Sequence, residues 1–136
     1  MELLEYFNTR DTFIRSVGAE MVRCEPGLAV MELTLEPRHM SDVAFHHAHA
    51  GLLYALAQSA SAAAFLSHGY DGYSVEGCIT FLDTVTAGKL TVTAKAKDMH
   101  DQESGKCRVT ITADDGRIIA KVHFVTCCTG KAFILQ

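Results

Sequence analysis

The residues best suited to chemistry gather just before a long uncharged segment. Four of the seven histidines fall within eleven residues: His39, His46, His47 and His49. The uncharged segment begins directly after them, at Ala50. If that segment is a helix, its first N–H groups have no partner inside the helix, and together with the helix dipole they favour a negative oxygen. The pattern is typical of a site that stabilises an oxyanion, the charge that develops when a carbonyl group is attacked.

Two other interpretations of the histidine cluster stay open. It can be a polar surface loop that ends in a helix N-cap. It can also be a metal site, because His46, His47 and His49 could supply imidazole ligands. The metal interpretation lacks a distant fourth ligand at a recognisable spacing, and the sequence has no HExxH helix. We therefore expect no metal and no cofactor.

The uncharged segment, Ala50 to Leu66, is 17 residues long, which is close to the lower limit for a membrane span. It is rich in alanine and serine, contains Gln58, and lacks aromatic or basic anchors at its ends. A helix that is apolar on all sides can instead be buried inside a soluble protein. We predict a buried helix from about Ala48 to Ser67, ended by His68-Gly69 with the glycine in the left-handed conformation.

Hydrophobic alternation with a period of two predicts strands on both sides of this helix. Before it, a short helix within Leu3–Ile14 is followed by a hairpin that pairs Val17–Cys24 with Leu28–Glu36 around the turn at Pro26-Gly27. After it come four strands: Tyr73–Leu82, Leu90–Lys97, Cys107–Asp114 and Ile118–Cys127.

One apolar helix among about six antiparallel strands has one economical arrangement, in which the sheet curls around the helix and buries it. The expected fold is therefore α+β, a hotdog fold with a long central helix wrapped by a curved antiparallel sheet of five to six strands. We expect residues 1–136 to form a single domain of this kind. The exposed sheet edges and the open side of the helix predict a homodimer or a dimer of dimers.

Composition and charge exclude some classes of binding partner. The chain has 136 residues, is 49% hydrophobic, and carries a net charge of −4 without a block of like charges. This balance predicts that neither nucleic acid nor a membrane is a partner. The N-terminus resembles no signal peptide, and the five cysteines have no CxxC spacing, so we expect a cytoplasmic protein with reduced thiols. Cys78 and Cys107 are predicted to be small core residues on apolar strand faces.

The segment HAGLLYALAQSA, residues 49–60, resembles the HGG-x-x-x-x-L-A-D-x-A segment of the PaaI-type (phenylacetate-pathway) acyl-CoA thioesterases of the hotdog superfamily. The turn at Gly88-Lys89-Leu90 and the hairpin at residues 115–120 also look like that family's. The resemblance covers most of the chain and implies hydrolysis of a small acyl- or aryl-CoA thioester to the free acid and CoA.

The resemblance assigns roles to individual residues. The N–H after the family's histidine binds the thioester carbonyl, and these two positions match His49 and Ala50. The family's catalytic carboxylate lies nine residues after the histidine and matches Gln58. A serine or threonine on the next strand, contributed across the dimer interface in some relatives, matches Ser74. We expect these four residues to be catalytic.

Two positions depart from the family pattern. Gln58 cannot take a proton from water as a carboxylate does, although its amide can orient water. Val43 stands where the family has an Asn or Gln and cannot donate a hydrogen bond from its side chain. The nearest substitutes for the missing base are Asp42 and the imidazoles of the loop, since histidine ordinarily titrates near neutral pH. We expect the substrate to contact Asp42, His46, His47 and Gly51.

These departures leave two alternatives to hydrolysis. The first is a protein of the same fold that binds acyl-CoA without catalysis. The second is a hydroxyacyl thioester dehydratase or hydratase, because Tyr54–Gln58 also resembles the E-A-L-A-Q stretch of the hydroxyacyl-ACP dehydratases. Their catalytic Glu falls on Tyr54, however, and their His-Phe-Pro-Gly loop is missing.

Overall fold

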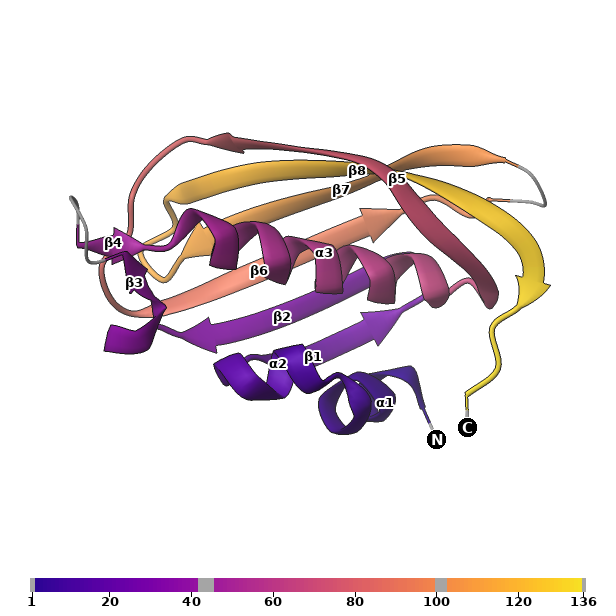
Figure 1. Ribbon diagram of the computed structural model, residues 1–136, viewed down its shortest axis with the longest axis horizontal. Helices are drawn as coiled ribbons and strands as arrows, with labels where there is room; N and C mark the ends of the chain where they lie inside the picture. The colour runs from indigo at the N-terminus through magenta and orange to yellow at the C-terminus, as the bar shows by residue number, and fades with distance from the viewer. Residues whose placement is uncertain (1, 42–45, 100–102, 136) are drawn as a thin grey trace.

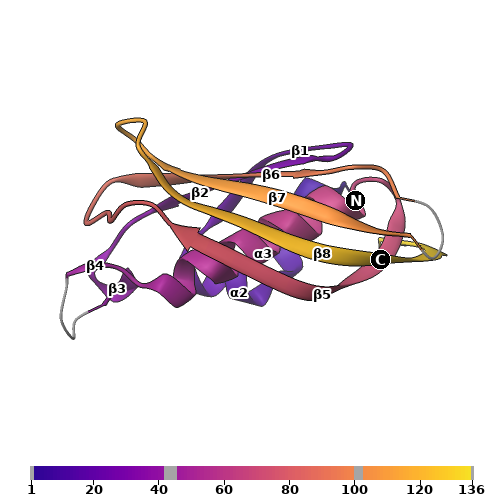
Figure 2. The same ribbon diagram turned by 90° about the horizontal axis from the view of Figure 1, so that it is seen from above.

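A six-stranded antiparallel sheet curves around one long helix in the computed structural model, which describes residues 2–41, 46–99 and 103–135. Figure 1 shows this helix, α3, along one face of the sheet, and Figure 2 shows the same layers from above. The strand order β1-β2-β6-β7-β8-β5 leaves β1 and β5 at the edges. The helices are α1 (Leu3–Arg10), α2 (Thr12–Val17) and α3 (Ala50–Leu66), and the strands are β1 (Glu20–Glu25), β2 (Leu28–Thr34), β5 (Tyr70–Phe81), β6 (Lys89–Ala96), β7 (Ser104–Ala113) and β8 (Ile118–Ala132). The arrangement confirms the predicted hotdog fold.

The composition of α3 explains why it is both helical and buried. Eleven of its 17 residues are alanine or leucine, which are the best helix formers. The small side chains of Ala57, Ala60 and Ala63 are fully buried, which brings the helix close to β2, β6 and β7. Among the described residues, no helix is long and apolar enough to cross a membrane.

The ends of α3 differ slightly from the prediction. The helix begins at Ala50 rather than Ala48, because residues 47–48 form β4 (His47–Ala48), a short strand paired with β3 (Met40–Ser41). It ends at Leu66, and Gly69 takes the predicted left-handed conformation with φ +94°. A 3-10 turn, η1 (Pro37–His39), leads into β3.

The N-terminal region forms two helices, where the sequence predicted one. The break lies at Asp11, which has an extended backbone and accepts a hydrogen bond from the Ile14 N–H at 3.1 Å, and so caps α2. Because α2 continues to Val17, the hairpin strand starts at Glu20 and not at Val17.

Strand edge β1 is covered, whereas β5 is open. The side-chain amide of Asn8 in α1 bonds both the N–H and the carbonyl of Met21 in β1, each at 2.8 Å. Among the described residues, strand β5 pairs only with β8. Five large apolar side chains on or just after it are exposed: Tyr70, Tyr73, Val75, Phe81 and Leu82. Unpaired apolar edges of this kind favour pairing with another strand.

The two cysteines predicted to be core residues have different positions. Cys107 is fully buried, as expected, but Cys78 is exposed. Cys78 pairs in register with His123 on the outer side of the sheet, away from α3. The alternation around Cys78 was a poor guide because β5 is an edge strand with little burial on either face.

Candidate active site

The first turn of α3 presents an N–H group that is available for a ligand. His49 is the N-cap residue, and its Nδ1 accepts a hydrogen bond from the Gly51 N–H at 2.9 Å. Ala50 is an exposed residue, and its N–H has no acceptor among residues 2–41, 46–99 and 103–135. Because the helix dipole adds partial positive charge at this end, the Ala50 N–H is suited to a developing oxyanion.

Buried His39 helps to hold this turn in place. Its Nδ1 accepts a hydrogen bond from the Glu36 N–H at 2.9 Å, so Nε2 carries the proton and donates to the Val17 carbonyl at 2.8 Å. The backbone carbonyl of His39 accepts from the His49 N–H at 2.9 Å. One histidine of the sequence cluster is therefore structural, and it positions the N-cap.

A cavity of about 280 Å³ opens beside the first turn of α3, and we call it the helix-start cavity. It is lined by His47, Ala48, Ala50, Leu53, Phe81, Asp83, Thr84, Val85 and Ile119. The Nδ1 of His47 lies 3.0 Å from the Ala48 carbonyl oxygen, which can only accept. Nδ1 therefore carries the proton when the ring is neutral, and Nε2 is then the unprotonated nitrogen.

Asp83 supplies the carboxylate of this cavity wall, and Arg117 holds it. The Arg117 Nη1 donates to Asp83 Oδ2 at 3.0 Å and to the Thr84 carbonyl at 2.9 Å. A hydrogen bond from the Thr84 N–H, followed by that from Arg117, lowers the pKa of Asp83 below its ordinary value, which makes it a weak base. The neighbouring Val85 carbonyl accepts from the Ala48 N–H at 2.8 Å, so this loop is joined to the start of α3.

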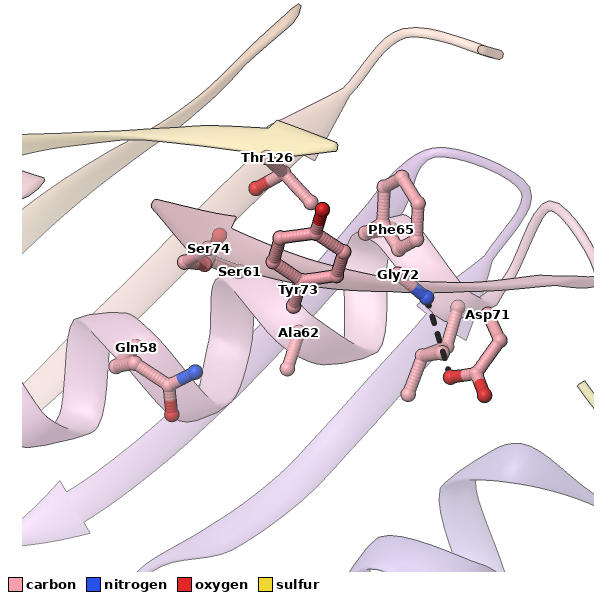
Figure 3. Close-up of a pocket in the computed structure, with 10 residues that line it drawn as sticks. Gln58, Ser61, Ala62, Phe65, Asp71, Gly72, Tyr73, Ser74 and Thr126 are labelled. Atoms are coloured by element: carbon pink, nitrogen blue, oxygen red, sulfur yellow. Dashed lines mark hydrogen bonds between the residues drawn. The ribbon is translucent and has the colours of Figure 1, made fainter. Parts of the chain in front are cut away.

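Gln58 and Ser74 lie together in a second cavity, between α3 and β5, which we call the mid-helix cavity (Figure 3). Its volume is about 110 Å³, and it is lined by Gln58, Ser61, Ala62, Phe65, Leu66, Asp71, Gly72, Tyr73, Ser74 and Thr126. Figure 3 draws Gln58 and Asp71 at opposite ends of this group, with the Asp71 carboxylate accepting from the Gly72 N–H at 3.1 Å. Asp71 is therefore not placed to replace the carboxylate missing at Gln58.

Tyr54 lies between the two groups of site residues. It follows Ala50 by one helical turn and precedes Gln58 by another, and its ring packs against Phe124 of β8 with centroids 5.3 Å apart. Its hydroxyl lies against Gly77 of β5, where any side chain would overlap it. A helix rises about 1.5 Å per residue, so Ala50 and Gln58 are about 12 Å apart along α3. Within one protomer, a single thioester group cannot contact both.

The remaining site expectations have different outcomes. Asp42 and Val43 lie outside the described residues. His46 is exposed. The N–H of Gly51 already donates to the capping Nδ1 of His49. Within the described part of the chain, no three His, Cys, Asp or Glu residues lie close enough together to hold a metal ion.

Sequence reasoning missed the loop that forms the far wall of the helix-start cavity. Phe81, Asp83 and Val85 come from the end of β5 and the loop after it, and Arg117 comes from the turn before β8. The only local signal is the charged pair Asp115–Arg117 in a tight turn, which is typical of a solvated hairpin. These residues lie beside the start of α3 only because of the register in which β5 pairs with β8.

No protein-family model matches this sequence, and no curated protein matches it. Solved structures do match. The PaaI protein of the E. coli phenylacetic acid degradation operon is 22% identical over 98% of this chain and 100% of that chain, with a TM-score of 0.81. The similarity shows that the chain has the hotdog fold of PaaI and related thioesterase structures.

Two other similar structures contain a ligand. A hypothetical thioesterase from Streptococcus pneumoniae TIGR4, solved with coenzyme A, is 22% identical, covers 85% of this chain and 88% of its own, and has a TM-score of 0.76. A Streptococcus mutans UA159 protein bound to acetyl CoA is 21% identical, covers 85% and 91%, and also has a TM-score of 0.76.

Proposed function

We propose that this protein hydrolyses a small acyl- or aryl-CoA thioester, with the thioester carbonyl bound at the start of α3. The observation that carries the proposal is the N–H of the exposed residue Ala50, which has no acceptor within the described residues and lies beside a mostly apolar cavity of about 280 Å³. The acyl group occupies the helix-start cavity, against Leu53, Phe81 and Val85. Its carbonyl oxygen accepts from Ala50. The similar structures solved with coenzyme A and with acetyl CoA support the choice of a CoA thioester.

The chemistry follows from the groups around this carbonyl. A water molecule attacks the carbonyl carbon, and its proton passes to Nε2 of His47. The Ala50 N–H stabilises the resulting oxyanion. When the carbon–sulfur bond breaks, the CoA sulfur leaves and the proton returns from the imidazolium to it. Asp83 is not assigned as the base, because its lowered pKa and its ion pair with Arg117 oppose protonation.

A dimer places the remaining site residues. Pairing through the open β5 edge covers the exposed apolar side chains of that strand, whereas Asn8 and α1 block the same pairing at β1. When two β5 strands pair antiparallel about a two-fold axis perpendicular to them, the two α3 helices also run in opposite directions. The helix start of one protomer can then approach Gln58 and Ser74 of the partner subunit, which one protomer cannot achieve alone. There Gln58 orients the attacking water.

The departures at the catalytic positions favour one competing function, an acyl-CoA binding protein without hydrolysis. Gln58 is a neutral amide, and the carboxylate nearest to the helix start is held by Arg117. A protein with these features keeps the pocket and the carbonyl donor while it lacks the usual base.

A panel of acyl- and aryl-CoA thioesters, assayed for thiol release and for binding, separates the two functions. Release well above the buffer rate supports hydrolysis, and tight binding without release supports the binding protein. If no thioester binds, both proposals fail. Sedimentation at micromolar concentration tests the dimer, and a species of 14.8 kDa alone would contradict the shared site.

A further inference from the structure

The outer face of strands β6, β7 and β8, opposite α3, carries a group of cations. Acids on this face lie on the flanking strands, at Glu32 of β2 and Glu76 of β5. The outward positions of β6 and the residue after it are Lys89, Thr91, Thr93, Lys95 and Lys97. Those of β7 are Lys106, Arg108, Thr110 and Thr112, and those of β8 include Lys121 and His123. None of these outward positions is Asp or Glu, and the register sets Lys95 directly opposite Arg108, which is opposite His123.

Four of these cations have no acidic partner in an ion pair among the residues described. Lys95, Lys97, Lys106 and Arg108 make no ion pair within the described part of the chain, whereas Lys89 and Arg117 do. Like charges directly opposite in a sheet are destabilising. The four cations also lie in a chain whose net charge is −4, so they form a local positive patch on an otherwise acidic protein.

The same four residues surround a hollow. A cavity of about 380 Å³ is lined by Lys95, Lys97, Lys106 and Arg108 together with Gly27, Leu28 and Ala96. This volume is in the range of small-molecule sites. A guanidinium and three ammonium groups suit two adjacent phosphates, since Arg binds phosphate oxygens in pairs and Lys acts as a point charge. Leu28 and the aliphatic stems of the lysines offer apolar surface to a base or sugar.

We propose that this cationic hollow binds the diphosphate of a nucleotide. A second copy of the chain is a poorer occupant, because packing two such faces together would set cations against cations. The hollow is on the face of the sheet opposite α3, and the helix-start cavity is on the α3 side, so the proposal does not depend on thioester hydrolysis. A nucleotide diphosphate could come from a free nucleotide or from the nucleotide end of CoA.

The test is calorimetric binding of ADP at physiological ionic strength, with pyrophosphate and adenosine as partial probes. We expect ADP to bind, pyrophosphate to bind more weakly, and adenosine not to bind. Arg108→Gln and Lys95→Gln should each weaken ADP binding by about tenfold or more, since each removes a charge-assisted contact. Lys131→Gln, which removes an equal charge at the far end of β8, should bind ADP like the unaltered protein.

The proposal is overturned if ADP does not bind at millimolar concentration, or if Arg108→Gln and Lys95→Gln bind it unchanged while their unfolding temperatures are normal. Two further assays identify the source of the nucleotide. If Arg108→Gln raises KM for an acyl-CoA but not for the matching acyl-pantetheine, the ligand is the substrate's own nucleotide end. If KM is unchanged while ADP binding is lost, the ligand is a separate nucleotide. The ADP measurement requires no turnover, so a failure of hydrolysis leaves the test of the cationic hollow intact.

Discussion

Replacing Ala50 with proline removes the proposed oxyanion donor and leaves the fold in place. Proline is favoured at the first position of a helix, where its missing N–H costs no intrahelical hydrogen bond. The residue before a proline must be extended, and His49 already has φ −62° and ψ 131°. The side chain of Ala50 is exposed, so the ring has space. The perturbation is therefore confined to one N–H group.

The expected cost follows from what this group does. Loss of a single oxyanion-hole donor lowers kcat by about 100- to 1000-fold, or roughly 2.7–4 kcal/mol of transition-state stabilisation. Ground-state binding should change much less, because most of the substrate contacts the cavity walls and not this N–H. Initial rates of thiol release from a saturating small acyl-CoA give kcat, and their concentration dependence gives KM.

Ala50→Gly is the matched control, because it retains the N–H and should keep kcat within a few-fold of the unaltered protein. Thermal unfolding of both variants should resemble that of the parent. If Ala50→Pro is folded and retains the parental kcat, the start of α3 does not stabilise the oxyanion and the assignment is wrong.

Three further perturbations test other parts of the structure. Gln58→Asp restores a carboxylate and should raise kcat, whereas Gln58→Ala should lower it by about tenfold, the effect of one hydrogen bond; equal rates for both would remove Gln58 from the site. Gly77→Ala should destabilise the fold by about 1–3 kcal/mol in urea unfolding, because its Cβ would overlap the Tyr54 hydroxyl, and adding Tyr54→Phe should recover part of that loss; strictly additive effects would show that the two do not touch. Because the folded pKa of Asp83 lies below its ordinary value of 3.8, its pairing with Arg117 stabilises the fold above that pH and ceases to do so as pH falls through the lowered value. Arg117→Ala should therefore be less stable than the parent at pH 7, and the two unfolding curves should converge in acid; a difference that persists at low pH would assign the effect to packing.

The fold could be predicted from the sequence because its signals are local. The uncharged stretch from Ala50 to Leu66 and the alternation in Leu90–Ala96 each fix one element and the face that it buries. A buried helix and alternating strands leave few ways of covering the helix. The break at Asp11 was missed because one capping hydrogen bond decided it.

The candidate site was less predictable than the fold, because part of it is assembled from residues that are far apart in the sequence and are brought together by strand pairing. His49, Ala50 and His47 are neighbours in sequence, and the structure brings all three to the start of α3. The Asp83–Arg117 pair joins residues 34 positions apart, and no local pattern marks it. Lys95, Lys97, Lys106 and Arg108 alternate along two predicted strands, but only the register between β6 and β7 places Lys95 opposite Arg108.

A structure with a bound ligand would test the central claim most directly. The ligand is an acyl-CoA analogue in which a methylene group replaces the thioester sulfur, so that the carbonyl remains and hydrolysis is blocked. We predict its carbonyl oxygen within hydrogen-bond distance of the Ala50 N–H, its acyl group in the helix-start cavity, and Gln58 of the partner subunit nearby. An ordered analogue whose carbonyl lies elsewhere, with the Ala50 N–H untouched, would contradict the claim.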